Sequence, residues 1–145
     1  MLSISPWNVK PPHIPSNQIK LNKLISKMTS EGWKGRPILA LKYSDTVRAL
    51  TGSHRIEAAR ASGLKTIPVL TLDGPWFENV LKADYGLSAD LDLDDVLWHV
   101  QLTYWGRHRI AMLAKKHGHK KFHDVMMREG KQSRSPVMKP VLNPA

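Results

Sequence analysis

The stretch Thr51–Val69, TGSHRIEAARASGLKTIPV, decides how the first half of this chain folds. A glycine leads directly into Ser-His-Arg, an alanine-rich helical run follows, and Gly63 is typical of the left-handed residue that ends a helix. A helix that begins straight after a turn presents its first free N–H groups to whatever lies above the turn. The pattern therefore predicts either a plain helix cap at Ser53 or a site for an anion.

Each residue of the turn suits a phosphate group. Gly52 permits a tight turn and close approach to the backbone. Ser53 caps the helix or donates its hydroxyl, and His54 offers a neutral donor or, when protonated, a charge. Arg55 carries a planar fork of donors that matches phosphate oxygens. From the residues alone, phosphate binding and simple capping stay open as equal alternatives.

The segments before and after this stretch complete a small α/β pattern. Apolar residues from Ile19 to Met28 recur at three- and four-residue spacing, which predicts an amphipathic helix from Gln18 onward. Residues 37–43 and 46–51 predict a hairpin, and residues 64–72 predict a third strand. Pro68 favours an edge position or a strand start, because proline cannot donate to the ladder. The four prolines within residues 1–17 predict extended or turn-like chain.

The rest of the chain reads as helical. We expect a helix after Pro75, a long helix over residues 94–117 that Gly106 weakens, and a shorter helix closed by Gly130. The predicted fold is α/β, a small mixed sheet with packed helices over residues 1–73. A helical extension over residues 74–130, basic in its second half, and a disordered tail over residues 131–145 follow it.

Composition excludes several classes of protein. The chain has 145 residues and no cysteine, which rules out a disulfide scaffold, a thiolate metal cluster and a thiol nucleophile. No apolar run approaches the ~20 residues of a membrane span, and the first residues do not form a signal peptide pattern. We therefore expect a cytoplasmic protein with no membrane partner.

Charge is unevenly distributed along the chain, and the net value is +10. Residues 1–71 carry eleven Lys and Arg against three acids, a balance of +8. Residues 72–106 carry one lysine against seven acids, or −6, and residues 107–145 carry ten against two, again +8. Such a field attracts polyanions, so nucleic acid, free nucleotides and acidic protein surfaces are the expected partners.

The segments VKPPHIPSNQI, IKLNKLISKM, GWKGRPILAL and ALTGSHRIEAARASGLKTIPV together resemble the ParB/sulfiredoxin-like superfamily, often labelled the ParB-like nuclease domain. The resemblance runs from Lys20 to Leu72, a little under half of the chain. It implies a small α/β fold that binds a nucleoside triphosphate, ATP or CTP, with Mg²⁺ as a further candidate. It implies that Gly52, Ser53, His54 and Arg55 hold the phosphates, and that the helix contributes Lys20, Lys23 and Lys27.

The chain departs from the members of this superfamily in three ways. Sulfiredoxins carry a catalytic cysteine where this chain has Ser53, so their redox reaction is not available. His54 stands where the partitioning proteins have a second arginine, and no helix-turn-helix is evident after residue 73. Amino-acid kinases of the superfamily use a glutamate near the N-terminal loop, and no acid precedes Glu31. The chain thus resembles the stand-alone, phage- or plasmid-borne members, whose activities vary.

A catalytic role would fall on Glu57 and His54. Glu57 lies one helical turn after Ser53, on the same face as the expected anion site, where it could orient a metal or water. The alternative is an exposed carboxylate that pairs with Arg60 or Lys65.

The basic residues of the second half are candidates for contact with DNA: Arg107, Arg109, Lys115, Lys116, Lys120 and Lys121. Trp105 either packs on the core, which we favour, or forms a stacking surface for bases. The five histidines after residue 98 stand in a basic context that repels cations, so we expect no metal site.

Three functions follow from these observations. The first is a ParB-like protein that binds a nucleotide phosphate at the Gly-Ser-His-Arg turn and associates with DNA. The second is a nuclease or nucleotide hydrolase that uses the same turn. The third is a DNA-binding regulator without enzymatic activity, in which the turn is only a cap.

Overall fold

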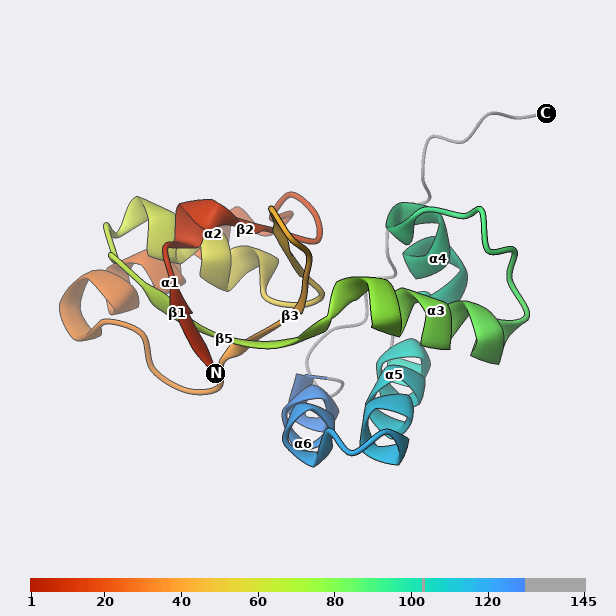
Figure 1. Cartoon of the computed structure of the whole chain (residues 1–145). Coiled ribbons are helices and arrows are strands. Elements are labelled where there is room, and N and C mark those ends of the chain that lie inside the picture. The colour runs from red at the N-terminus through yellow and green to blue at the C-terminus, as the bar shows by residue number, and fades with distance from the viewer. Residues whose placement is uncertain (103, 130–145) are drawn as a thin grey trace. The chain divides into compact units, whose positions relative to one another are not determined.

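The computed structural model describes residues 1–102 and 104–129 and divides the chain into two compact units (Figure 1). The first unit is Met1–Asp73 and the second begins at Gly74. The predicted tail over residues 131–145 and the predicted helix end at Gly130 lie outside the described residues.

The first unit is built on a five-stranded mixed sheet in the order β1-β5-β3-β4-β2. Its strands are β1 (Leu2–Ile4), β2 (Val9–Lys10), β3 (Ile38–Lys42), β4 (Val47–Ala49) and β5 (Ile67–Asp73). β3 pairs parallel with β5, and β2 pairs parallel with β4, whereas the pairs β1–β5 and β3–β4 are antiparallel. The α/β class with a small mixed sheet and a helical C-terminal part is confirmed.

The predicted hairpin is present, and its turn is closed by a hydrogen bond of 2.8 Å from the Tyr43 N–H to the Thr46 carbonyl. The edge position suggested by Pro68 is wrong, because β5 lies between β1 and β3. Pro68 is the second residue of β5. Its other suggested position, at the start of a strand, therefore applies.

Both edges of the sheet come from the N-terminal segment. β1 forms one edge and β2 the other, and a short 3-10 helix, η1 (Pro6–Asn8), connects them. Residues 1–17 were expected to be extended or turn-like, and they are. Their proline content gave no sign that they pair into the sheet, because strand pairing depends on partners 38 residues or more away in sequence.

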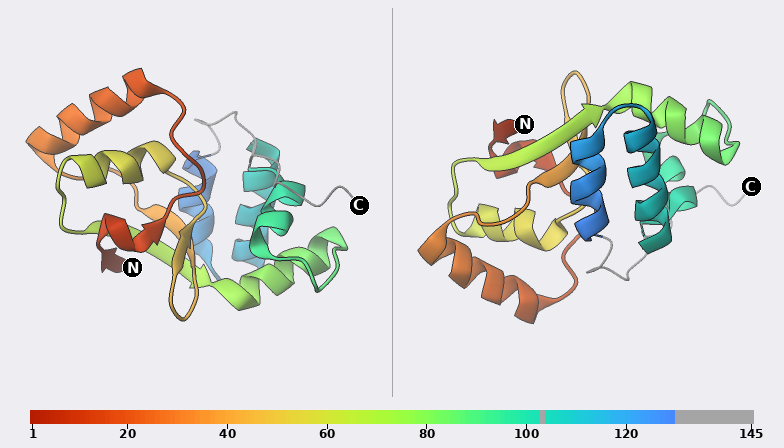
Figure 2. Two further views of the ribbon diagram at one scale, coloured as in Figure 1. Left: turned by 90° about the horizontal axis from the view of Figure 1, so that it is seen from above. Right: turned by 90° about the horizontal axis from the view of Figure 1, so that it is seen from below.

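Helices α1 (Gln18–Glu31) and α2 (Ser53–Ala61) lie side by side (Figure 2). They pack with the sheet around one buried core. Its residues are Val9, Met28, Ile38, Ala40, Val47, Ala49, Ile56, Ala58, Ala59, Ile67 and Val69. Helix α2 contributes the small residues Ala58 and Ala59 to this core, and it packs against α1.

The second unit contains α3 (Gly74–Tyr85), α4 (Leu93–Val100), α5 (Tyr104–Lys116) and α6 (Lys120–Glu129). The single helix expected over residues 94–117 is wrong: α4 ends at Gln101, whose φ of 56° interrupts the helix. The break precedes Gly106, which lies inside α5. A Cβ at Gly106 would overlap the carbonyl oxygens of Val100 and Gln101, so this glycine permits the close corner between α4 and α5.

Helices α5 and α6 form a tightly packed pair (Figure 2). Within the described part of the chain, no helix is both long enough and apolar enough to cross a membrane.

Candidate functional site

The turn before α2 depends on Gly52. Its φ of 83° and ψ of 33° lie in the left-handed region, and a Cβ there would overlap the Cδ1 of buried Ile38. Gly52, not Ser53, is the N-cap residue, and no side chain caps α2 in the described structure. The helical N–H groups of the first turn have no partner within the helix. Free N–H groups of this kind at a helix start are suited to bind an anion.

Ser53 is the first residue of α2 and is 4% exposed. Its hydroxyl has no hydrogen-bond partner among the described residues. A buried hydroxyl without a partner costs about 1–3 kcal/mol, which makes an unpartnered hydroxyl at a helix start a sign of a ligand-binding position. The expectation that Ser53 is a plain cap is wrong, because Gly52 occupies the cap position.

His54 connects the beginnings of the two helices. Its Nε2 accepts a hydrogen bond of 3.2 Å from the N–H of Asn17. A ring nitrogen that accepts carries no proton, so the proton of the neutral ring lies on Nδ1. Partial burial, together with the nearby charges of Lys20 and His13, lowers the pKa of His54 below its ordinary value. Of the two forms of His54 that the sequence allowed, the neutral donor and the protonated cation, the structure favours the neutral donor.

Asn17 also caps α1. Its Oδ1 accepts a hydrogen bond of 3.0 Å from the N–H of Lys20. Neither α1 nor α2 has an acidic residue in its first turn. The Asn17–His54 hydrogen bond joins the N-termini of α1 and α2. The positive ends of two helix dipoles therefore lie close together, and no carboxylate in either first turn offsets them.

Arg55 folds back along the turn. One of its Nη atoms donates a hydrogen bond of 2.7 Å to the carbonyl of Arg36, and its guanidinium lies 5.2 Å from the ring centroid of Trp33. It thus holds the segment between α1 and β3 against the start of α2. A guanidinium carries five N–H donors, so this contact still permits others.

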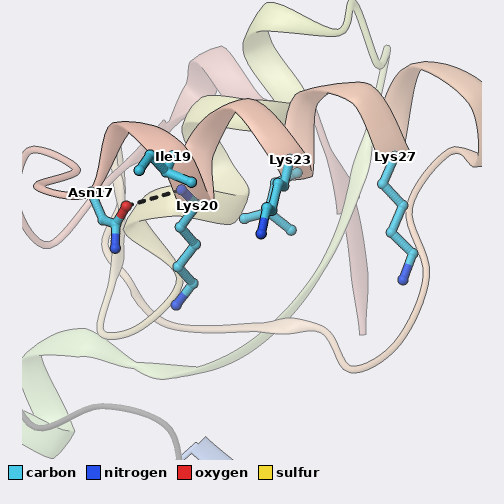
Figure 3. A pocket seen from close by; sticks show the side chains of 6 residues that line it. Asn17, Ile19, Lys20, Lys23 and Lys27 are labelled. Carbon is cyan, nitrogen blue, oxygen red and sulfur yellow. Dashed lines mark hydrogen bonds between the residues drawn. The ribbon is translucent and has the colours of Figure 1, made fainter.

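Lys20, Lys23 and Lys27 project from the same side of α1 (Figure 3). With Asn17, Ile19 and Leu24 they line a shallow pocket of about 400 Å³. All three lysines are exposed, and Ile19 is 70% exposed. The pocket thus combines three cations with an apolar patch, next to the start of α1.

Glu57 pairs with Arg60, at 3.6 Å between Oε2 and Nη1. Arg60 in turn donates to the carbonyls of Pro6 (3.0 Å) and Val9 (2.9 Å) and lies 5.0 Å from the ring centroid of Trp7. This is the pairing that the sequence offered as the alternative to a catalytic role. In residues 1–102 and 104–129, no three His, Asp or Glu side chains gather in a group that could hold a metal ion.

The basic residues of the second unit separate into two kinds. Arg107 is 7% exposed and donates to the carbonyl of Glu129 at 3.2 Å, so it does not lie on the surface where contact with DNA was expected. Arg109 donates to Asp84 at 2.6 Å and lies 3.7 Å from the ring centroid of Tyr85. The four predicted lysines are exposed, and they are Lys115, Lys116, Lys120 and Lys121.

Lys120 pairs with Asp124 at 3.0 Å. Trp105, for which core packing was favoured, is 74% exposed. Sequence reasoning also missed Asn17, although an asparagine directly before a helical period is a signal of a helix cap.

No family model matches the sequence, and no curated protein matches it. Solved structures that resemble the chain include sulfiredoxin from Arabidopsis thaliana, with 24% identity and a TM-score of 0.44 over 50% of this chain and 84% of that one. A free serine kinase in complex with AMP has 28% identity and a TM-score of 0.43. The match covers 50% of this chain and 30% of the kinase.

The C-terminally truncated chromosome-partitioning protein ParB from Caulobacter crescentus, complexed with CTP-γ-S, has 18% identity and a TM-score of 0.45. The match covers 87% of this chain and 69% of that one. Sulfiredoxin and ParB are thus among the solved structures that the chain resembles at low sequence identity.

Proposed function

We propose that the place where α1 and α2 begin binds the phosphates of a nucleotide. The observation that carries the proposal is the buried, unpartnered hydroxyl of Ser53 at the uncapped start of α2. This hydroxyl lies at the N-terminus of α2, which the Asn17–His54 hydrogen bond joins to the N-terminus of α1. Helix N-termini attract anions through their free N–H groups and their dipoles. An anion there would satisfy the Ser53 hydroxyl, which the described residues leave without a partner.

The residues of the turn take different roles in this proposal. The backbone N–H groups after Gly52 and the hydroxyl of Ser53 donate to phosphate oxygens. His54 donates through Nδ1, since its Nε2 is occupied by Asn17. Arg55 holds the segment around Arg36 in place and adds positive charge beside the turn. Charge-assisted hydrogen bonds of this kind are about twice as strong as neutral ones.

The pocket on α1 would take the remainder of the nucleotide. Lys20 lies in the first turn of α1, where its charge acts on His54, and Lys23 and Lys27 follow on the same side of the helix (Figure 3). Ile19 and Leu24 supply apolar surface for a base or a sugar. This arrangement suits a nucleoside triphosphate, ATP or CTP, better than inorganic phosphate alone.

The proposal stops at binding, because Glu57, the one carboxylate of α2, is paired with Arg60. A magnesium ion at this site would take its ligands mainly from the phosphates and water, as magnesium commonly does. A nuclease or a nucleotide hydrolase would need Glu57 or His54 to be released from its present partner.

Calorimetric titration with ATP, CTP and GTP, each with and without Mg²⁺, tests the proposal. We expect saturable binding of at least one triphosphate, and none of the corresponding nucleoside. Lys20→Gln should weaken binding about tenfold, as the loss of one charge-assisted hydrogen bond predicts. Lys65→Gln, which removes an exposed lysine before β5, should leave binding unchanged. The proposal fails if no triphosphate binds the wild-type protein, or if the nucleoside binds equally well.

We propose, second, that the helices α5 and α6 contact DNA. The observation in favour is the run of exposed lysines at the end of α5 and the start of α6, Lys115, Lys116, Lys120 and Lys121. Phosphate contacts from lysine need charge and exposure and little specific geometry. Binding of a labelled DNA fragment should weaken when these lysines are replaced by glutamine, and unchanged binding would refute it.

A further inference from the structure

Helix α5 divides sharply into a buried and an exposed side. Successive residues of a helix turn by about 100°, so the residues of the exposed side fall within an arc of about 140°. They are Tyr104, Trp105, Arg109, Met112, Lys115 and Lys116, and the half-buried His108 lies among them. The buried side consists of Gly106, Arg107, Ile110, Ala111, Leu113 and Ala114. The exposed side is therefore one continuous strip along the helix.

The first half of this strip is aromatic. Trp105 is 74% exposed, Met112 45% and Tyr104 42%. The ring centroids of Tyr104 and Trp105 lie 5.0 Å apart at 87°, and those of Tyr104 and His108 lie 6.4 Å apart at 14°. The rings thus contact one another, while most of the surface of Trp105 remains open to solvent. Exposing such large apolar surface is costly unless something covers it in use.

The second half of the strip is cationic. Lys115 and Lys116 end the helix on the same arc, about 16 Å beyond Trp105 at the helical rise of about 1.5 Å per residue. Helix α5 contains no acidic residue. Arg109 belongs to the strip, but it is paired with Asp84. The strip therefore presents aromatic rings next to positive charge.

We infer that this strip binds single-stranded nucleic acid, with bases stacked on Trp105 and Tyr104 and phosphates along Lys115 and Lys116. Stacking platforms beside cations are the arrangement by which proteins hold unpaired strands. A duplex keeps its base faces covered and offers such rings nothing to stack on. The inference rests on the proposed contact with nucleic acid and specifies its substrate class, and it is independent of the nucleotide site.

The charge of the strip decides among possible occupants. A second copy of the chain would bring two cationic strips together, with no acidic residue on α5 to offset their charge. An acidic peptide would match the lysines but would leave the flat aromatic surface without a specific partner. Unpaired DNA and unpaired RNA match both halves, and the experiment distinguishes them.

Fluorescence anisotropy with a labelled fifteen-nucleotide oligothymidylate, the corresponding oligouridylate and a duplex of the same length tests the inference at one fixed salt concentration. Trp105→Leu should weaken binding of the single strand about tenfold, since base stacking is worth about 1–3 kcal/mol per base. Binding of the duplex should change little. Trp105→Phe should retain most of the affinity, because a phenyl ring still stacks.

Trp7→Leu is the matched control, since Trp7 is also an exposed tryptophan, at 67%, and lies in the first unit. It should leave single-strand binding unchanged. An unchanged melting temperature for Trp105→Leu shows that the fold is intact. A stronger effect on the oligothymidylate than on the oligouridylate assigns the strip to DNA, and the reverse assigns it to RNA.

Four results would overturn the inference. If the single strand binds equally to the wild type and to Trp105→Leu, or if the duplex loses affinity by the same factor, the rings do not stack on bases. If no nucleic acid binds at all, the proposed contact with DNA fails together with it. Dimerisation that Trp105→Leu abolishes, without any effect of an oligonucleotide, assigns the strip to a second copy and also overturns the inference.

Discussion

Ser53 is the residue at which stability and binding should conflict. Its hydroxyl is buried without a partner in the described structure, a state that costs free energy in the absence of a ligand. Ser53→Ala removes that hydroxyl and fits the same space. We expect the unfolding free energy of the ligand-free protein to rise by about 1 kcal/mol, while affinity for the triphosphate falls. Urea unfolding and calorimetry measure the two effects.

A loss of both stability and affinity would contradict this prediction, since it would show that the hydroxyl has a partner within the protein. Ser62→Ala is the matched control. Ser62 ends α2, and its hydroxyl already donates to the carbonyl of Ala58 at 2.8 Å. Its replacement should leave nucleotide affinity unchanged.

His54 should make stability depend on pH in a direction that follows from its environment. Partial burial and the charges of Lys20 and His13 lower its folded-state pKa below the ordinary value of 6.5. The unfolded chain therefore binds more protons just below that value, and stability falls as the pH decreases through it. Protonation would also break the bond from Asn17. Wild-type protein should lose more stability between pH 7.5 and 5.5 than His54→Gln does.

Urea unfolding at several pH values measures this difference, and equal pH dependence in the two proteins would contradict it. A bound phosphate adds negative charge near the ring and should raise the pKa of His54. Titration of the His54 resonances by NMR, with and without triphosphate, checks the shift. A pKa unaffected by saturating nucleotide would place the phosphates elsewhere.

At the scale of elements, apolar periodicity predicted α1, and the alanine-rich run closed by Gly63 predicted α2; both helices contribute residues to the core. The two N-terminal strands were missed, because two or three residues carry too little pattern to show pairing with distant strands. The turn Gly52–Arg55 was located by its local chemistry. Its connection to Asn17, 37 residues away, is a tertiary contact that no local pattern contains.

The corner between α4 and α5 shows the same limit. The sequence predicted a weakened helix at Gly106, whereas the helix is interrupted at Gln101. Gly106 lies in α5 and faces the carbonyl oxygens of Val100 and Gln101. The charge of Arg107 and its basic neighbours predicted contact with DNA. Arg107 lies on the buried side of α5, where its donor reaches the carbonyl of Glu129.

Gly106→Ala tests this corner. In an ordinary helix the change would stabilise by up to about 1 kcal/mol. Here the added Cβ meets the carbonyl oxygens of Val100 and Gln101, so we expect a loss of about 1–3 kcal/mol, the usual cost of overpacking. Urea unfolding measures the change in unfolding free energy, and a decrease supports the close corner whereas an increase contradicts it. Met112→Ala, an exposed change on the same helix, should alter stability by less than about 0.5 kcal/mol.

For the whole molecule, the positive charges proposed to bind nucleotide and those proposed to bind nucleic acid belong to different units of the chain. The basic residues of the nucleotide site lie in the first unit, and the exposed lysines of α5 and α6 lie in the second. An acidic stretch of −6 over residues 72–106 stands between them in sequence. The two proposed activities therefore rest on different residues, and a change of charge at one set removes none of the groups that the other uses.

The salt dependence of single-strand affinity measures how many phosphate contacts the lysines of α5 make. On a single strand, each phosphate contact contributes about 0.7 to the slope of the logarithm of affinity against the logarithm of salt concentration. The double variant Lys115→Gln and Lys116→Gln should therefore have a slope smaller by about 1.4 than the wild type. Lys65→Gln, which removes an equally exposed lysine from the first unit, should keep the wild-type slope and give the matched comparison.

Trp105→Leu should behave differently from the lysine variants. It should lower the affinity at every salt concentration by the same factor and leave the slope unchanged, because stacking releases no counterions. The double lysine variant should bind ATP or CTP as the wild type does. A slope that falls for Trp105→Leu, or a loss of nucleotide affinity in the lysine variant, would show that the two surfaces act on one ligand and not on two.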